Sequence, residues 1–215
     1  MSNDNQETEK IFKIVIAGNS GVGKTNLVSR YVDDEFDETY KTTIGLDFKF
    51  KETTIIGEVC RIQIWDTAGQ EKLKAVAASY YRNANGIAII FDITNRESYD
   101  KLDFWINEAT NNVPESTPFI IIGNKNDLVD QRKVSMEEAR DFVTKRGYYY
   151  VETSAKTNKD DCVTKAFDQL VGEMLNKRNA QVENEYKQQK IRRSQMKLQE
   201  KDVTTQPGEK KKGCC

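Results

Sequence analysis

The sequence predicts an α/β fold built on a six-stranded, mostly parallel sheet, with one antiparallel edge strand and helices on both faces. Short apolar runs alternate with amphipathic segments from about residue 12 to residue 177. This alternation is typical of strand–helix–strand units with right-handed crossovers. Two of the runs are separated only by a tight turn at Gly57-Glu58, so we expect a hairpin that places one antiparallel strand at the sheet edge.

The expected strands are the apolar runs at 12–18, 48–56, 59–66, 86–92, 118–123 and 148–153. The expected helices are the amphipathic segments at 24–33, 71–82, 96–112, 135–147 and 158–177. Val163, Phe167, Leu170 and Met174 step by four, three and four residues, which is the helical period. Ser135, followed three residues later by a glutamate, predicts a capping box at the start of the fourth helix.

The chain divides by composition into a flexible N-terminus (1–10), a folded domain (11–177) and a flexible basic tail (178–215). Between residues 176 and 213 there are 11 Lys and Arg against 5 Asp and Glu, which leaves 22 basic and 29 acidic residues elsewhere. The polar stretch after 176 has few apolar anchors, so we expect it to act as a linker without a core. A basic tail on an acidic body directs the tail toward an anionic partner, and membrane and nucleic acid both fit at this stage.

Composition excludes several classes of protein. No apolar run approaches the ~20 residues of a membrane span, and the N-terminus MSNDNQETEK has no apolar stretch that could serve as a signal peptide. The four cysteines have no metal-ligand spacing, so we expect a reducing, cytosolic compartment. The absence of histidine excludes Ser-His-Asp and Cys-His mechanisms and histidine-bound zinc.

A phosphate-binding motif follows the first expected strand. GNSGVGKT (18–25) matches G-x-x-x-x-G-K-[ST] and opens a helix, as the motif requires, so we predict a P-loop NTPase fold. Backbone N–H groups around Gly21 to Thr25 can surround a β-phosphate, and the helix N-terminus favours the anion. Lys24 reaches the β- and γ-oxygens and the Thr25 hydroxyl can ligate Mg²⁺. A glycine-rich turn with a surface lysine is the competing interpretation.

Two further segments select the base. NKND (124–127) leaves a buried strand, so Asn124 and Asp127 project into the crevice at the strand's carboxyl end. A carboxylate accepts from both N1–H and the 2-amino group of guanine, whereas adenine presents a bare N1 lone pair. NKND alone is also an ordinary turn composition. ETSAK (152–156) follows the last strand, where the Ala155 N–H can reach the guanine O6, and the three segments together predict guanine nucleotide binding.

A switch is predicted from WDTAGQE (65–71) and TTIG (42–45). Asp66 ends a strand and can hold Mg²⁺ through water, Gly69 offers an N–H beside the γ-phosphate, and Gln70 can orient the attacking water. The Thr43 hydroxyl can complete the Mg²⁺ shell, although its position alone also fits an ordinary loop threonine. Loops held only by γ-phosphate and metal contacts loosen when that phosphate leaves.

Taken together, these five motifs resemble the Ras superfamily of small GTPases. Within it, IGLDF (44–48), RIQIW (61–65), YYRNA (80–84) and IIFDIT (89–94) are similar to segments typical of the Rab family, and the match covers about residues 10–178. The nucleotide contacts that the resemblance implies are Ser20, Gly21, Val22, Gly23, Lys24, Thr25, Asn26, Phe36, Thr43, Gly69, Asn124, Lys125, Asp127, Ser154, Ala155 and Lys156. It also implies catalytic roles for Gln70, Lys24 and Gly69, and Mg²⁺ contacts for Thr25, Thr43 and Asp66.

The resemblance further implies an effector surface formed by Ile44, Phe48, Trp65, Leu73 and Tyr80, and geranylgeranylation of Cys214 and Cys215. A chance pair of free thiols is the other explanation of the terminal cysteines. Two departures stand out: KLKAVAAS follows GQE where Rabs usually carry Arg-Phe, and Asn83 replaces a usual glycine. Because asparagine tolerates a left-handed backbone, the second change is expected to be harmless.

The function that follows from the resemblance is a Mg²⁺-dependent GTP/GDP switch in vesicle trafficking, on the cytoplasmic face of an intracellular membrane and cycling with the cytosol. Its implied partners are an exchange factor, a GTPase-activating protein, effectors, and a GDP-dissociation inhibitor or escort protein. A GTP-binding module with negligible hydrolysis, acting as a membrane adaptor, is the alternative. A nucleic-acid-binding GTPase is disfavoured for two reasons. The body is acidic, and Tyr186 is the one aromatic residue among the basic residues of the tail, where bases would need aromatic side chains to stack on.

Overall fold

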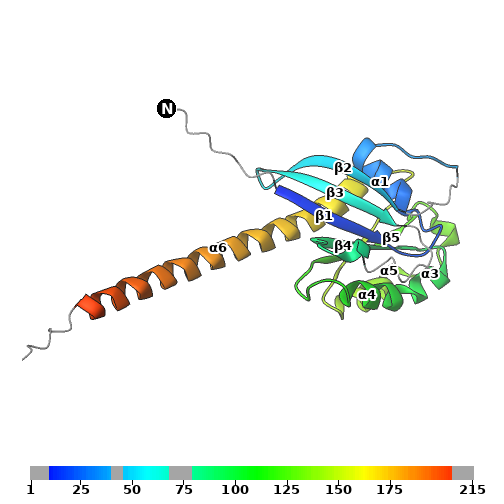
Figure 1. Cartoon of the computed structure of the whole chain (residues 1–215). Helices are drawn as coiled ribbons and strands as arrows, with labels where there is room; N and C mark the ends of the chain where they lie inside the picture. The colour runs from blue at the N-terminus through cyan, green and yellow to red at the C-terminus, as the bar shows by residue number, and fades with distance from the viewer. Residues whose placement is uncertain (1–9, 40–45, 68–78, 205–215) are drawn as a thin grey trace, which may run out of the picture. The chain divides into compact units, whose positions relative to one another are not determined.

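The computed structural model describes residues 10–39, 46–67 and 79–204. Its centre is a six-stranded sheet in the order β2-β3-β1-β4-β5-β6 (Figure 1). The strands are β1 (Lys10–Ala17), β2 (Leu46–Ile55), β3 (Glu58–Thr67), β4 (Gly86–Asp92), β5 (Phe119–Asn124) and β6 (Tyr149–Glu152). The edge strand β2 pairs antiparallel with β3, and the other neighbouring strands of this sheet are parallel. The predicted fold class is confirmed.

Burial follows the sequence pattern of each strand. Every residue of β4 (GIAIIFD) and β5 (FIIIGN) is buried, as expected for central parallel strands covered on both faces. In β3, Cys60, Ile62 and Ile64 are buried, while the intervening Arg61 and Gln63 are only partly covered. The period of two in β3 therefore reflects one packed and one more open face near the sheet edge.

The β2–β3 turn lies one residue earlier than expected. Ile55 pairs with Glu58, so the two turn residues are Ile56 and Gly57, with φ of 52° and 77°. Positive φ at both positions is the requirement of a type I′ turn. The glycine suits it, but Ile56 is β-branched and 74% exposed, so it holds a strained backbone without the gain of burial.

The helices are α1 (Lys24–Asp33), α3 (Arg96–Asp100), α4 (Leu102–Thr110), α5 (Met136–Thr144) and α6 (Cys162–Thr204). The single helix expected at 96–112 is broken at Lys101, where φ is −87° and ψ is 0°. The Ser135 cap is confirmed, because its Oγ accepts a 3.1 Å hydrogen bond from the Glu138 N–H. Most of the expected helix 71–82 lies outside the described residues, although 79–81 are helical.

The helices pack on the two faces of the sheet. On one face lie α1 and the first turns of α6, where the rings of Tyr31 and Phe167 stack with centroids 4.5 Å apart (Figure 1). On the other lie α3, α4 and α5, whose Tyr99, Leu102 and Val143 join one buried cluster with Phe91 of β4. This layering leaves the carboxyl ends of the parallel strands open for the loops that follow them.

The last helix differs most from expectation. It continues to Thr204, into the stretch from residue 178 that the sequence predicts to be a flexible linker without a core. Residues 178–204 contain neither glycine nor proline, so nothing local stops a helix that began on a packed face. By contacts the chain separates into two compact units, 1–174 and 175–215. Residues 181–193 are exposed, as expected for a helix without a core of its own. None of the described helices has the length and apolarity needed to cross a membrane.

Candidate functional site

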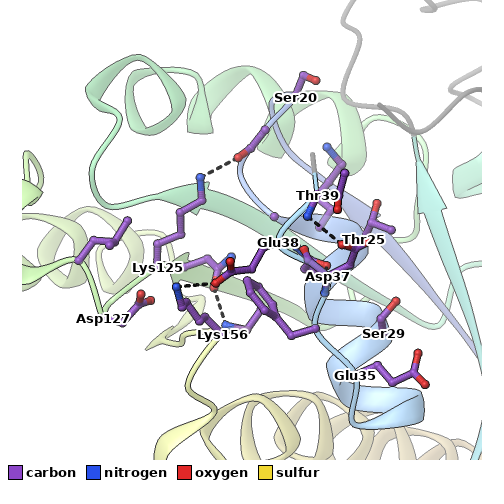
Figure 2. Close-up of a pocket in the computed structure, with 18 residues that line it drawn as sticks. Ser20, Thr25, Ser29, Glu35, Asp37, Glu38, Thr39, Lys125, Asp127 and Lys156 are labelled. Atoms are coloured by element: carbon purple, nitrogen blue, oxygen red, sulfur yellow. Dashed lines mark hydrogen bonds and ion pairs between the residues drawn. The ribbon is translucent and has the colours of Figure 1, made fainter. Parts of the chain in front are cut away.

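A cavity of about 740 Å³ opens at the carboxyl ends of β1, β5 and β6. It is lined by the loop and first turn of α1, the segment 35–39, the loop after β5 and the loop after β6 (Figure 2). The lining residues are Ser20, Gly21, Gly23, Lys24, Thr25, Asn26, Ser29, Glu35, Phe36, Asp37, Glu38, Thr39, Asn124, Lys125, Asp127, Leu128, Ala155 and Lys156. The structure thus brings three separated sequence motifs to one hollow.

The loop between β1 and α1 has a backbone that requires glycine. Gly18 has φ of 136°, and a Cβ there would lie 2.1 Å from the carbonyl oxygen of Ile90. Gly23 has φ of 95° and caps α1, and its Cβ would lie 2.4 Å from Nδ2 of Asn124. These glycines allow the loop to pass close to β4 and β5.

Lys24 folds back over this loop. Its Nζ donates 2.9 Å hydrogen bonds to the carbonyl oxygens of Gly18 and Asn19, and the residue is only 6% exposed. Burial lowers the pKa of the Lys24 ammonium to about 8, against the opposing effect of the nearby Asp66 carboxylate. The ammonium therefore lies beside the cavity with a reduced preference for its charged form, which an anionic ligand would restore.

Asp66 and Thr25 form a hydroxyl–carboxylate pair at one wall. The Thr25 Oγ1 donates to Asp66 Oδ2 at 2.5 Å. Burial raises the pKa of Asp66, opposed by this hydrogen bond and by the charge of Lys24. Within the described ranges, Asp66 Oδ1 is buried without a hydrogen-bond partner. A buried acceptor left open beside a hydroxyl suits a hard cation such as Mg²⁺, which proteins often bind through one or two carboxylates plus phosphate oxygens. Among the described residues no group of three or more acidic or cysteine side chains is placed to hold a metal ion, and a site completed by phosphate oxygens does not need one.

Asn124 joins the loops rather than pointing freely into the cavity. Its Nδ2 donates to the Val22 carbonyl at 2.9 Å, and its Oδ1 accepts from the backbone N–H of Ala155 and the hydroxyl of Thr153, both at 3.3 Å. The residue is 2% exposed. Asn124 therefore sets the distance between the loop that joins β1 to α1 (the phosphate-type loop, residues 18–23) and the loop after β6.

Lys125 makes a second connection. Its backbone has φ of 69°, and its Nζ donates to the Gly21 carbonyl at 2.8 Å and pairs with Asp92 Oδ2 at 2.7 Å. Asp127 follows at the cavity wall, and Figure 2 shows it near Lys156, across from Thr25 and Thr39. Within the NKND motif, Asn124 and Lys125 thus bond to the loop before α1, and Asp127 lies at the cavity.

The loop after β6 is held by hydrogen bonds within the loop and from α1. Ser154 is fully buried and its Oγ accepts from the Thr157 N–H at 3.0 Å, while the Ala155 carbonyl accepts from Arg30 Nε at 2.9 Å. The side chain of Lys156 extends to Glu38, with Nζ and Oε1 2.7 Å apart. Hydrogen bonding to Glu38 raises the pKa of Lys156.

Beside the predicted Phe36, the segment 35–39 lines the cavity with residues that the sequence does not predict: Glu35, Asp37, Glu38 and Thr39. Asn26 Nδ2 donates to the Asp37 carbonyl at 2.9 Å, and Asp37 Oδ1 accepts from the Thr39 N–H at 2.8 Å. These contacts hold Phe36, half-buried, at the cavity. The acidic run around Phe36 was the available signal, but a run of charges more often marks a solvated surface.

Several predicted residues fall outside the described ranges: Thr43, Ile44, Gly69, Gln70, Leu73, Cys214 and Cys215. Val22 is fully buried and contributes its carbonyl to Asn124. Asn83 has φ of 60°, so the expected left-handed backbone is present there.

The predicted aromatic surface is partly assembled. Phe48, 55% exposed, stacks near Trp65 with centroids 6.3 Å apart, and Phe50 adds an edge contact to Phe48 at 5.6 Å. Lys13 Nζ lies 3.6 Å from the centre of the Trp65 ring. Tyr80 is half-buried in the helical turn at 79–81. Phe50 was not predicted, although its spacing of two from Phe48 places it on the same strand face.

The sheet, the glycine-dependent loop and the cavity at the strand ends define an α/β nucleotide-binding protein of the P-loop class. Residues 13–176 match the family model described as Ras family. The chain is 40% identical over 177 residues to the rice Ras-related protein RIC1, covering 82% of this chain and 87% of the relative. It is 42% identical over 152 residues to Arabidopsis thaliana Ras-related protein RABD2b, covering 71% and 75%. It is 36% identical over 213 residues to the Saccharomyces cerevisiae GTP-binding protein YPT1, covering 98% and 100%. The chain therefore belongs to the Rab group of the Ras family of small GTPases.

Proposed function

We propose that this protein is a GTP/GDP-dependent switch that hydrolyses GTP and recruits effectors to membranes in vesicle trafficking. The observation that supports this most directly is the single cavity shared by the phosphate-type loop, the Asp127 loop and the Ala155 loop. Relatives such as YPT1, named as a GTP-binding protein, support the same nucleotide.

Guanine recognition is assigned to the loops after β5 and β6. Asp127 accepts from guanine N1–H and the 2-amino group, and Phe36 packs against the base. In the structure the Ala155 N–H donates to Asn124 Oδ1 at 3.3 Å, a long bond that a guanine O6 can share or replace. Sites built on such paired hydrogen bonds reject analogues that lack them by roughly 10⁴-fold.

The phosphates are assigned to the loop before α1. Backbone N–H groups around Gly21 to Thr25 would bind the anion at the helix N-terminus, and Lys24 would leave its carbonyl contacts for the β- and γ-oxygens. Thr25 and Asp66, with Thr43, are the residues that would hold Mg²⁺. Bound there, the ion would neutralise the negative charge that develops on the transferred phosphoryl group.

Hydrolysis is assigned to water positioned by Gln70, with Gly69 donating its N–H to the γ-phosphate. The water oxygen attacks the γ-phosphorus, the bond to the bridging oxygen breaks with its electron pair staying on GDP, and both protons of the water end on the released phosphate. The sequence has no arginine in its phosphate-type loop, so intrinsic turnover is expected to be slow, about 10⁻⁴ s⁻¹, and dependent on an activating partner for speed. Gln70→Leu is expected to slow GTP hydrolysis in a single-turnover assay while leaving the dissociation constant for GTP unchanged. Hydrolysis as fast as that of wild type would refute the role assigned to Gln70. A wild type that binds GTP without hydrolysing it would favour the adaptor alternative.

Membrane attachment is assigned to the C-terminus. Two geranylgeranyl chains on Cys214 and Cys215 give stable anchoring where one chain gives only marginal binding. Lys210, Lys211 and Lys212 add about 1 kcal/mol each at an anionic leaflet. The exchange factor, GTPase-activating protein, effectors and GDP-dissociation inhibitor or escort protein are the partners that such a cycle requires.

The deciding experiment is a binding titration with GDP, GTP, XDP and ATP. Wild type is expected to bind GDP and GTP with submicromolar dissociation constants and to show no detectable binding of ATP. Asp127→Asn is expected to shift the preference toward xanthosine diphosphate (XDP), because the exocyclic oxygen at C2 of xanthine accepts a hydrogen bond from an amide. Asp130→Asn is the matched control, because Asp130 is an exposed acid three residues away that does not line the cavity. Tight ATP binding by the wild type would refute the proposed function.

A further inference from the structure

Arg132 and Glu152 form a paired contact away from the cavity lining. The guanidinium donates from Nη1 to Glu152 Oε1 at 2.8 Å and from Nη2 to Oε2 at 2.7 Å. The Glu152 side chain is 5% exposed and that of Arg132 is 25% exposed. Two parallel hydrogen bonds of this kind fix orientation as well as distance.

The two partners belong to the two loops assigned to the base. Glu152 is the last residue of β6 and leads directly into the loop that carries Ala155. Arg132 closes the loop that leaves β5 at Asn124 and carries Asp127, and its Nη1 also donates to the Val134 carbonyl at 3.1 Å. The pair therefore joins the far end of one loop to the root of the other.

A second link joins the same loops nearer the cavity. The Asn126 N–H donates to the Thr153 carbonyl at 3.0 Å. With the Arg132–Glu152 pair, this contact leaves the two loops little freedom to slide or tilt against each other. Asn124 Oδ1 also joins these loops through the Ala155 N–H and the Thr153 hydroxyl, but both hydrogen bonds are long, at 3.3 Å. The Arg132–Glu152 pair adds two short ones, at 2.8 and 2.7 Å.

Glu152 is itself held in place. The Tyr150 hydroxyl donates to Glu152 Oε1 at 2.9 Å, and a Cβ on Gly123 would lie 2.7 Å from that hydroxyl oxygen. Gly123 directly precedes Asn124, so the missing side chain lets Tyr150 pass under the start of the Asp127 loop. The carboxylate that Arg132 binds is thus rigidly placed beneath both loops.

We propose that Arg132 is a positioning residue for guanine recognition: its paired contact with Glu152 sets the spacing between Asp127 and the Ala155 N–H. This inference rests on the proposed guanine-binding function. Donors on N1 and C2 must meet Asp127 while O6 meets the other loop, so recognition depends on the separation of the two loops and not on either alone. The phosphates are assigned to a different loop, the one before α1, so a change in this separation acts first on recognition of the base.

The test compares GDP with inosine diphosphate, which lacks the 2-amino group. The dissociation constants of both ligands are measured by competition for wild type, Arg132→Gln and Arg132→Lys. Wild type is expected to prefer GDP, and Arg132→Gln to reduce that preference about five- to tenfold, because Asp127 no longer meets both donors squarely. Arg132→Lys is expected to fall between, because an ammonium supplies the charge without the fork.

The control is Arg146→Gln, which removes an arginine–carboxylate contact of 2.8 Å with Asp103 on an exposed surface. Its GDP-to-inosine-diphosphate ratio is expected to equal that of wild type. If Arg132→Gln and Arg132→Lys lower both affinities equally and leave the ratio unchanged, Arg132 has only a structural role and the inference is overturned. If Arg132→Gln does not fold, Arg132→Lys, which keeps Glu152 paired, decides by the same ratio. A wild type without preference for guanine nucleotides would instead refute the proposed function.

Discussion

Replacing Gly23 with alanine tests the close approach on which the cavity depends. The new Cβ would lie 2.4 Å from Asn124 Nδ2, closer than real Cβ contacts come, and the backbone would hold φ of 95°. The neighbour that must move is Asn124, whose side chain joins the phosphate-type loop to the loop after β6. One methyl group is therefore expected to separate the two halves of the site.

The magnitude follows from two contributions. A non-glycine residue in the left-handed region costs about 1–2 kcal/mol. Displacing Asn124 weakens its contacts with the Val22 carbonyl at 2.9 Å and with the Ala155 N–H at 3.3 Å, at ~1 kcal/mol for each hydrogen bond. We therefore expect Gly23→Ala to lose about 3–4 kcal/mol in unfolding free energy.

Gly147→Ala separates these contributions. Gly147 has φ of 77°, and a Cβ there would meet nothing within 4 Å, so it carries the backbone cost alone. The midpoint temperature of thermal unfolding, measured at a fixed excess of GDP, is expected to fall by roughly 10 °C for Gly23→Ala and roughly 4 °C for Gly147→Ala. These values use ~2–4 °C per kcal/mol, which is typical of a chain of this size. GDP dissociation should accelerate only in Gly23→Ala. Equal losses in the two variants would show that the contact with Asn124 carries no energy.

Three further predictions concern other parts of the chain. The pKa of Lys24, about 8, lies below the ordinary 10.5, so the folded protein holds fewer protons than the unfolded chain between these values and this group's contribution to stability rises with pH there. Because binding of the anionic phosphates requires the protonated Lys24 ammonium, GDP affinity should fall in titrations as pH rises through about 8, and a flat profile there would contradict the assignment. Ile56→Asn should raise stability by about 1 kcal/mol in thermal unfolding, because asparagine tolerates φ of 52°, whereas Val59→Asn at an exposed strand position should not. Changing Cys214 and Cys215 together to serine should move the protein to the soluble fraction with GDP affinity intact, and membrane association that persists would place the anchor elsewhere.

Much of the fold could be predicted because each strand carries its own signal. The buried strands β4 and β5 are apolar except for the polar residue that ends each of them, Asp92 and Asn124, and the Ser135 cap marks the start of α5. The hairpin turn was displaced by one residue because Ile56 gives no local sign of a positive φ. The helix over 178–204 is not predicted by apolar periodicity, because the segment has few apolar residues, but many of its residues are good helix formers.

The order of the strands along the chain, the P-loop at 18–25 and the polar residues at the strand ends can all be inferred from the sequence alone. These follow from short motifs and periodicity, which are local properties. Tertiary structure decided which groups those side chains touch: Asn124 spans Val22 and Ala155, and Arg132 reaches Glu152 twenty residues away. Such contacts depend on how two crossovers place their loops side by side, and no local pattern encodes the distance between two loops.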